Sequence, residues 1–105
     1  MLVAARRLGV DAALETQLNE THREIYDRII GALPVMTPKA HRWVPEMLEI
    51  ARTFEAVGLT PRVFHGAGDL YEFVAATALG KETPENRDKS RGGKDVIRLL
   101  ADERG

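Results

Sequence analysis

Four polar residues near the middle of the chain have the types and spacing of an anion-binding patch. Lys39, Arg42 and Glu46 recur at intervals of three and four residues, and His41 lies among them. On a helix, such intervals bring side chains to one side. Arginine provides a planar fork for a carboxylate or a phosphate. The same spacing suits a solvated salt-bridge network equally well, so the spacing alone does not choose between the two interpretations.

Other catalytic patterns are not present in the sequence. The three histidines are isolated, so no HExxH pair is available for zinc. Ser90 is the only serine and lies in a charged segment without a neighbouring histidine, which argues against a serine triad. The Gly66-Ala67-Gly68 triplet falls inside an expected helix with no strand before it, so we reject it as a dinucleotide fingerprint. We therefore expect no catalytic, cofactor-binding or metal-binding residue in this chain.

Composition is that of an ordinary globular domain. The chain has 105 residues, of which 44% are hydrophobic and 30% charged, and this length suits a single domain. A formal net charge of -1 gives no electrostatic sign of nucleic acid or of an anionic membrane as a partner. Cysteine is absent, which excludes disulfides and thiolate sites and is compatible with the cytoplasmic location that we expect. No apolar run approaches the ~20 residues of a membrane span.

The elements that must position the polar patch are expected to be helices throughout, because apolar residues recur at spacings of three and four and no alternating stretch of useful length appears. Thr37-Pro38 opens the longest helix, which Gly58 closes, and Pro45 inside it predicts a kink or a restart. Thr60-Pro61 opens the next helix, which ends at Gly80. The apolar stripe of that second helix consists of Val63, Phe64, Ala67, Leu70, Tyr71, Val74 and Leu79.

The two ends of the chain give weaker signals. Residues 1–8 have the pattern of the last turns of a helix that began earlier, and Asp11 can cap a short second helix. Thr21 and Glu24 form a capping box that predicts a third helix from His22, which ends at Pro34. Ile25, Ile29 and Leu33 line one face of it, with Tyr26 and Ile30 beside them. Residues 81–105 are expected to form a charged loop and a short terminal helix. The sequence predicts an all-α, compact multi-helix domain over residues 1–105.

Small and surplus apolar residues point to further helix contacts. Gly66 and Gly68 each cost helix stability relative to alanine, so two of them close together predict tight backbone contact with another helix. Apolar residues also fall off the main stripes of the two central helices, which is typical of a partner surface. We therefore expect a homodimer, docking to another domain, or both. These off-stripe residues are Met47, Leu48, Ile50 and Phe73.

Two segments of the central helices have a distinctive amino-acid sequence. WVPEMLEIARTFEAVGLTP is followed by DLYEFVAATALGKE. Over residues 39–80 the sequence resembles the helix pair in the C-terminal helical domain of the β-hydroxyacid and phosphogluconate dehydrogenases. The stretch from Arg42 to Pro61 is most similar to a subgroup of phosphogluconate-dehydrogenase-like oxidoreductases, and residues 1–8 match the end of the family's interdomain helix.

That resemblance implies a division of labour between domains. Enzymes of the family bind NAD or NADP in an N-terminal Rossmann domain and carry a catalytic lysine on the interdomain helix, and both would lie upstream of this chain. The family's second lysine falls on Pro45, and its aspartate falls on Glu46. The candidates for substrate binding are therefore Lys39, His41 and Arg42, with Glu46 in a structural hydrogen-bonding role.

The function implied is a C-terminal, substrate-side and dimerisation domain of an NAD(P)-dependent hydroxyacid dehydrogenase-like oxidoreductase. The parent enzyme would pass a hydride between a 2- or 3-hydroxy acid and nicotinamide, whereas this chain alone would be inactive. One alternative is a free-standing helical dimerisation or interaction module without catalysis. Another is a small helical regulator that binds an anionic metabolite or nucleic acid through Lys39, Arg42 and Arg62, although the balanced net charge argues against nucleic acid.

Overall fold

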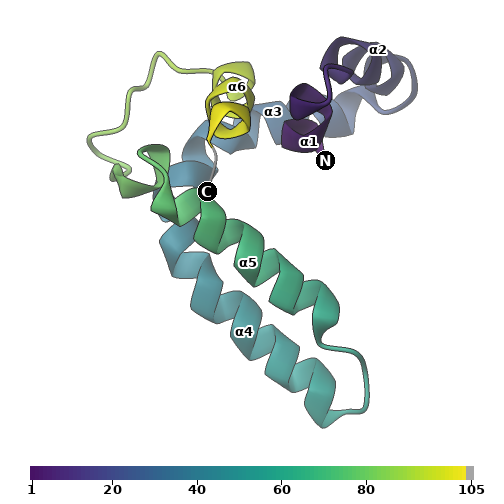
Figure 1. Cartoon of the computed structure of the whole chain (residues 1–105), viewed down its shortest axis with the longest axis vertical. Coiled ribbons are helices and arrows are strands. Elements are labelled where there is room, and N and C mark those ends of the chain that lie inside the picture. Colours follow the sequence, from purple (N-terminus) through teal and green to yellow (C-terminus); the bar gives the residue numbers. More distant parts are fainter. Residues whose placement is uncertain (104–105) are drawn as a thin grey trace. The chain divides into compact units, whose positions relative to one another are not determined.

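The structure is a computed structural model that describes residues 1–103, and these residues form helices joined by turns and loops (Figure 1). No strand occurs within the described range, which confirms the all-α fold class. No helix in that range is long and apolar enough to cross a bilayer. The elements are α1 (Leu2–Arg7), α2 (Asp11–Thr21), α3 (Arg23–Met36), the 3₁₀ turn η1 (Thr37–Lys39), α4 (Ala40–Ala56), α5 (Arg62–Ala76), the 3₁₀ turn η2 (Leu79–Lys81) and α6 (Gly93–Asp102).

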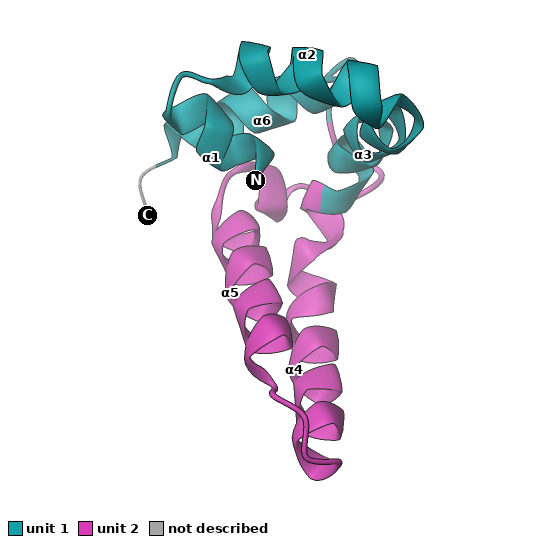
Figure 2. Cartoon of the chain, turned by 90° about the vertical axis from the view of Figure 1, so that its right-hand side faces the viewer, with its two compact units in different colours: residues 1–36, 88–105 teal, residues 37–87 magenta. Residues whose placement is uncertain are grey.

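These elements form two compact units (Figure 2). The first unit combines residues 1–36 with the chain from Asp88 onward, so it joins α1, α2 and α3 to α6. The second unit covers residues 37–87 and consists of the α4–α5 hairpin with the two 3₁₀ turns. The charged segment expected after Lys81 is the loop that leads to α6, and α6 is the expected terminal helix.

In the second unit, α4 and α5 pack side by side as the predicted hairpin (Figures 1 and 2). Two aromatic pairs link them: the ring centroids of Phe54 and Phe64 lie 4.8 Å apart, and those of Trp43 and Tyr71 lie 5.3 Å apart. Such pairs add to the apolar area that the helices bury. Helix α4 continues through Pro45 without the restart that the sequence suggested.

Glycine shapes this hairpin at two places. Gly58 has a φ of 83°, a left-handed conformation that favours glycine, and it closes α4 as predicted. At Gly68, a Cβ would lie 3.5 Å from Leu48 Cδ2 and 3.7 Å from Met47 Cβ, so this position faces α4 at ordinary van der Waals distance. The tight backbone contact predicted from the two glycines is therefore not formed at Gly68. At Gly66, no atom beyond the adjoining helix backbone lies within 4 Å of the position of a Cβ.

Two members of the apolar stripe predicted for α5 do not face α4. Val63 and Leu70 are 69% and 68% exposed, respectively. The face of α5 toward α4 is centred on Phe64, Gly68 and Tyr71, which turns Val63 and Leu70 outward. Because both faces of α5 are apolar, periodicity alone did not identify the inner one.

Three predicted helix boundaries need correction. Helix α3 does not end at Pro34 but continues to Met36, and α4 then begins at Ala40 after a 3₁₀ turn, so Thr37 is not its N-cap. Helix α5 ends at Ala76 rather than at Gly80. There the Thr77 hydroxyl donates to the Val74 carbonyl at 2.6 Å and accepts from the Gly80 N–H at 3.3 Å, so this side chain closes the helix earlier.

In the first unit, α6 packs against α1 and α3. Its buried residues recur at the three- and four-residue spacing of an amphipathic helix. The Arg7 side chain, from the end of α1, donates to the Ala101 carbonyl at 3.1 Å, to the Leu100 carbonyl at 3.4 Å and to the Glu103 carbonyl. A cation at this position satisfies carbonyls that the last turn of a helix leaves without partners. The buried residues of α6 are Gly93, Val96, Ile97, Leu100 and Ala101.

The helix starts predicted in this unit also differ. Thr21 is the last residue of α2, and its hydroxyl donates to the Gln17 carbonyl at 2.8 Å instead of capping a new helix. Asp11 is the first residue of α2 and makes no side-chain cap. In α3, Tyr26 is buried with 6% exposure, whereas Ile25 and Ile29, which form the predicted apolar face beside it, are 57% and 43% exposed.

Two glycine substitutions should have effects of opposite sign on stability. Gly93→Ala places a Cβ 2.1 Å from the Ile30 carbonyl oxygen, so it should lower the free energy of unfolding by roughly 1–3 kcal/mol. Gly31 lies inside α3 with no atom within 4 Å of a Cβ, so Gly31→Ala should raise that free energy by about 0.5–1 kcal/mol. Urea denaturation of both variants measures the two changes. Equal effects of the two substitutions would contradict this account of the α3–α6 contact.

Candidate functional site

The polar patch predicted from the sequence lies around the start of α4. Lys39 ends the 3₁₀ turn η1 and is half-buried, whereas His41, Arg42 and Glu46 are exposed on the first turns of α4. Within residues 1–103, no hydrogen bond or ion pair joins any of these four side chains to another residue. The expected alternative of a salt-bridge network is therefore not formed here. The patch presents charged groups to solvent without partners of their own.

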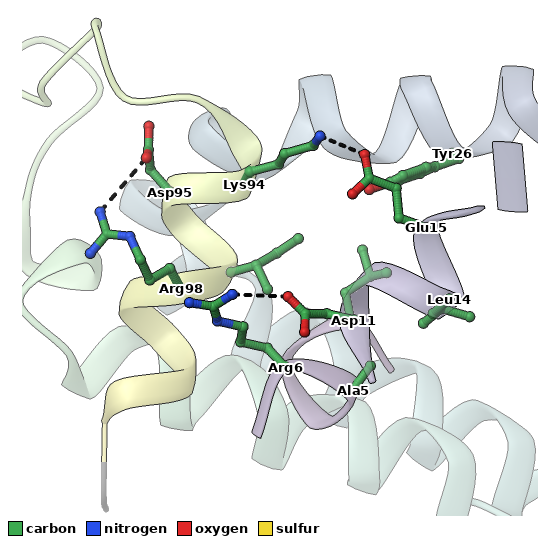
Figure 3. Close-up of a pocket in the computed structure, with 11 residues that line it drawn as sticks. Ala5, Arg6, Asp11, Leu14, Glu15, Tyr26, Lys94, Asp95 and Arg98 are labelled. Atoms are coloured by element: carbon green, nitrogen blue, oxygen red, sulfur yellow. Dashed lines mark hydrogen bonds and ion pairs between the residues drawn. The ribbon is translucent and has the colours of Figure 1, made fainter. Parts of the chain in front are cut away.

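A second polar region is a pocket of about 310 Å³ inside the first unit, where α1, α2, α3 and α6 meet (Figure 3). Its wall combines an apolar part with cations and carboxylates from helices far apart in the sequence. The residues that line it are Leu2, Ala5, Arg6, Asp11, Leu14, Glu15, Tyr26, Lys94, Asp95, Ile97 and Arg98.

Two ion pairs connect the helices around this pocket, and both are drawn in Figure 3. Arg6 Nη1 lies 3.0 Å from Asp11 Oδ2, and Lys94 Nζ lies 2.5 Å from Glu15 Oε1. The hydrogen bond from Arg6 holds the pKa of Asp11 below its usual range. The hydrogen bond to Glu15 raises the pKa of Lys94. Each bond favours the charged form of its group, which is the carboxylate of Asp11 and the ammonium of Lys94.

Tyr26 brings a buried phenol to the same pocket. Its side chain comes from α3, and burial, followed by the negative charge of Glu15, raises its pKa above the usual range. The phenol is therefore neutral over a wider pH range than an exposed tyrosine. The pocket thus holds a neutral hydroxyl beside paired charges of both signs. Such a set can orient a small polar molecule, but it contains no nucleophile activated by a base.

An apolar groove of about 270 Å³ lies on another side of Tyr26 in the same unit. Ile25 and Ile29, from the predicted apolar face of α3, are on its wall, so their exposed side chains still have apolar neighbours. The residues that line it are Met1, Leu2, Leu18, His22, Ile25, Tyr26 and Ile29. Over the described residues, no group of three or more His, Cys, Asp or Glu side chains is placed to hold a metal ion.

The sequence did not identify the pocket, because the ion pair that closes it between α2 and α6 joins distant segments. Lys94 and Glu15 are 79 residues apart, and no local spacing signals such a pair. Asp11 was interpreted only as a helix cap, and Lys94 as part of a charged loop. The one available signal was the mixed charge on one side of the terminal helix. By contrast, the patch at the start of α4 was found because its members lie within one stretch of the chain.

Comparison with protein families places this structure in context. Residues 5–74 match a family model described as a domain of unknown function, DUF1932. The chain belongs to the DUF1932 family. The matched part of this DUF1932 domain includes α2, α3, α4 and nearly all of α5, and with them every candidate residue at the start of α4. No curated protein and no solved structure matched the chain.

The DUF1932 match agrees in general with the resemblance drawn from the sequence. It is consistent with the C-terminal helical region of hydroxyacid dehydrogenase-like proteins. It carries no statement about a cofactor or a substrate. The stretch from Arg42 to Pro61, on which the resemblance mainly rests, lies wholly within the matched range and forms α4 with the turn after it.

The pKa shifts at the pocket predict a loss of stability at high pH. Lys94 has a raised pKa in the folded state, so its contribution is complete below the unfolded pKa and disappears as the pH rises through the folded value. Tyr26 also has a raised pKa, so above the unfolded value the unfolded chain loses this proton first and becomes favoured. The free energy of unfolding should therefore fall as the pH rises past about 10.

Glu15→Gln tests the origin of that fall, because it removes the carboxylate that acts on both groups. The variant should be less stable than the parent at neutral pH and should lose less stability between neutral and alkaline pH. Glu20→Gln, on the same helix and exposed, is the matched control and should follow the parent curve. Parallel pH curves for Glu15→Gln and the parent chain would contradict the assigned electrostatics.

Proposed function

We propose that this DUF1932 domain is the C-terminal, substrate-side and dimerisation domain of an NAD(P)-dependent hydroxyacid dehydrogenase-like oxidoreductase. The observation that carries this proposal is the family match over residues 5–74, which includes the stretch from Arg42 to Pro61. The observed all-helical structure and the α4–α5 hairpin support it as well. Residues 1–105 would act together as this domain.

Substrate binding is proposed for the patch at the start of α4. Arg42 is exposed and has no ion-pair partner within the described residues, so its guanidinium is free to take the carboxylate of a hydroxy acid. Lys39, half-buried just before the helix, would add a second cation, and His41 lies between them in the sequence. Glu46 lies one turn after Arg42 and would keep a structural role beside the patch.

The dinucleotide would be held elsewhere in the parent protein. A pyrophosphate site of the Rossmann type needs a strand that leads through a glycine-rich turn into a helix, and the described residues contain no strand. NAD or NADP would supply hydride transfer to or from the hydroxy acid. The chemistry assigned to this chain is therefore restricted to binding and orienting the substrate and to holding two subunits together.

A second candidate function is a free-standing dimerisation or interaction module without catalysis. The observation in its favour is the outward apolar surface of α5, where Val63 and Leu70 are more than two-thirds exposed. Large exposed apolar residues that recur on one helix face are typical of an interface. Both candidates require that surface to be covered, and only the first requires the patch at the start of α4.

Arg42→Ala in the native-length protein separates the two candidates. If the parent oxidises a hydroxy acid, loss of the guanidinium should reduce kcat/KM by about 10- to 100-fold, mainly through KM, because a charged hydrogen bond to the substrate is lost. The assay follows reduction of NAD and of NADP with a set of 2- and 3-hydroxy acids. Arg28→Ala, an exposed arginine on α3, is the control and should leave both constants unchanged.

Two results would overturn parts of this proposal. Unchanged kinetic constants in Arg42→Ala would remove the substrate role of the patch while leaving the oxidoreductase in place. A native-length protein without activity on any hydroxy acid with either dinucleotide would remove the oxidoreductase function. The interaction module would then be the remaining candidate.

A further inference from the structure

The side of α5 that faces away from α4 carries its own regular stripe. Val63, Gly66 and Leu70 follow one another at intervals of three and four residues, which places them on one face of the helix. All three are exposed, and the opposite face meets α4 through Phe64 and Tyr71. The stripe therefore has no role in the packing of the hairpin.

Gly66 in the middle of this stripe has no explanation within its own chain. Glycine inside a helix lowers stability relative to alanine. Gly68 at least lies against Leu48 of α4, whereas at Gly66 nothing beyond the adjoining helix backbone lies within 4 Å of a Cβ. The φ of Gly66 is not positive, so a side chain is also permitted by the backbone. The result is a shallow notch between two large exposed aliphatic side chains, a shape into which a side chain of another helix fits.

The charges beside the stripe indicate which helix that is. Arg62 and Asp69 are seven residues apart and flank the stripe on the same side. Both are exposed, and neither has an ion-pair partner within residues 1–103. When two copies of α5 pack antiparallel, the flanking positions that face each other are Arg62 of one copy and Asp69 of the other, and this happens twice. In a parallel pair they would instead face the uncharged Ala67 and Val74.

We propose that α5 pairs antiparallel with α5 of a second copy of this chain, with the two-fold axis near Gly66. Val63 of each copy fills the notch at Gly66 of the other, and two Arg62–Asp69 ion pairs close the same flank. A surface that is complementary to itself in this way is what an isologous two-fold interface requires. The inference rests on the dimerisation part of the proposed function and adds the surface, the orientation and the pairing residues.

Charge reversal on the full chain tests the orientation directly. Asp69→Arg and Arg62→Asp each turn two attractive pairs into two repulsive ones, so each should raise the dimer dissociation constant about tenfold or more. The double variant Arg62→Asp with Asp69→Arg restores opposite charges and should return the constant to within about threefold of the parent value. Sedimentation equilibrium over a dilution series measures the constants, and circular dichroism checks that each variant is folded.

Two further variants separate the interface from general charge effects. Glu72→Arg changes the charge of α5 by the same amount as Asp69→Arg but lies off the stripe, so it should leave the constant unchanged. Gly66→Leu has room in the single chain and should weaken the dimer at least about tenfold by filling the notch. A dimer whose constant is insensitive to Gly66→Leu and to both reversals would place the interface elsewhere and overturn the inference alone. A chain that stays monomeric throughout would overturn it together with the proposed dimerisation.

Discussion

The first unit depends on the close approach of Gly93 to the carbonyl of Ile30. Pro34 stands four residues after Ile30 in α3 and has no N–H to donate, so this carbonyl lacks its usual helical partner. The first residue of α6 lies against it, so near that a Cβ would be 2.1 Å from the oxygen. The proline therefore leaves a gap in the α3 ladder without ending the helix, and glycine is the residue that allows another helix to approach it. The other end of α6 is held by Arg7, whose guanidinium takes its last carbonyls.

The fixed position of α6 determines the electrostatics of the pocket. Because α6 is held at both ends, Lys94 reaches Glu15 of α2, and the phenol of Tyr26 lies among paired charges. The charged groups of the pocket form ion pairs with one another, Arg6 with Asp11 and Lys94 with Glu15. These ion pairs stabilise the arrangement of the four helices. The patch at the start of α4 differs in this respect, because Arg42 has no partner among the described residues. Because the cations Arg6 and Lys94 of the pocket are paired and Arg42 is not, we assign substrate binding to the start of α4 rather than to the pocket of the first unit.

Local signals in the sequence predicted the positions of the helices well. They predicted poorly which side chains and helices contact one another. The all-α class and the α4–α5 hairpin followed from apolar spacing and from turn residues such as Gly58, whose left-handed φ the structure confirms. The boundary at Pro34 was wrong because a proline removes one donor and does not by itself end a helix when the free carbonyl finds another contact. The capping role predicted for Thr21 was wrong, because its hydroxyl donates to the Gln17 carbonyl within α2. The capping-box pattern does not distinguish this hydrogen bond from a cap of the next helix. The pocket was missed because long-range ion pairs leave no periodic trace.

Helix α5 shows most clearly where sequence reasoning stopped and why. Gly66 and Gly68 look equivalent in the sequence, yet a rotation of about 200° between residues two apart puts them on opposite sides of the helix. One glycine lies against α4, and the other opens toward solvent. Exposed aliphatic residues that recur on one helix face are typical of an interface. A helix that is apolar on both sides, with a notch on each, is better explained by two packing partners than by one. The first partner is α4, and the second that we propose is α5 of another copy, which the unmatched charges of Arg62 and Asp69 favour.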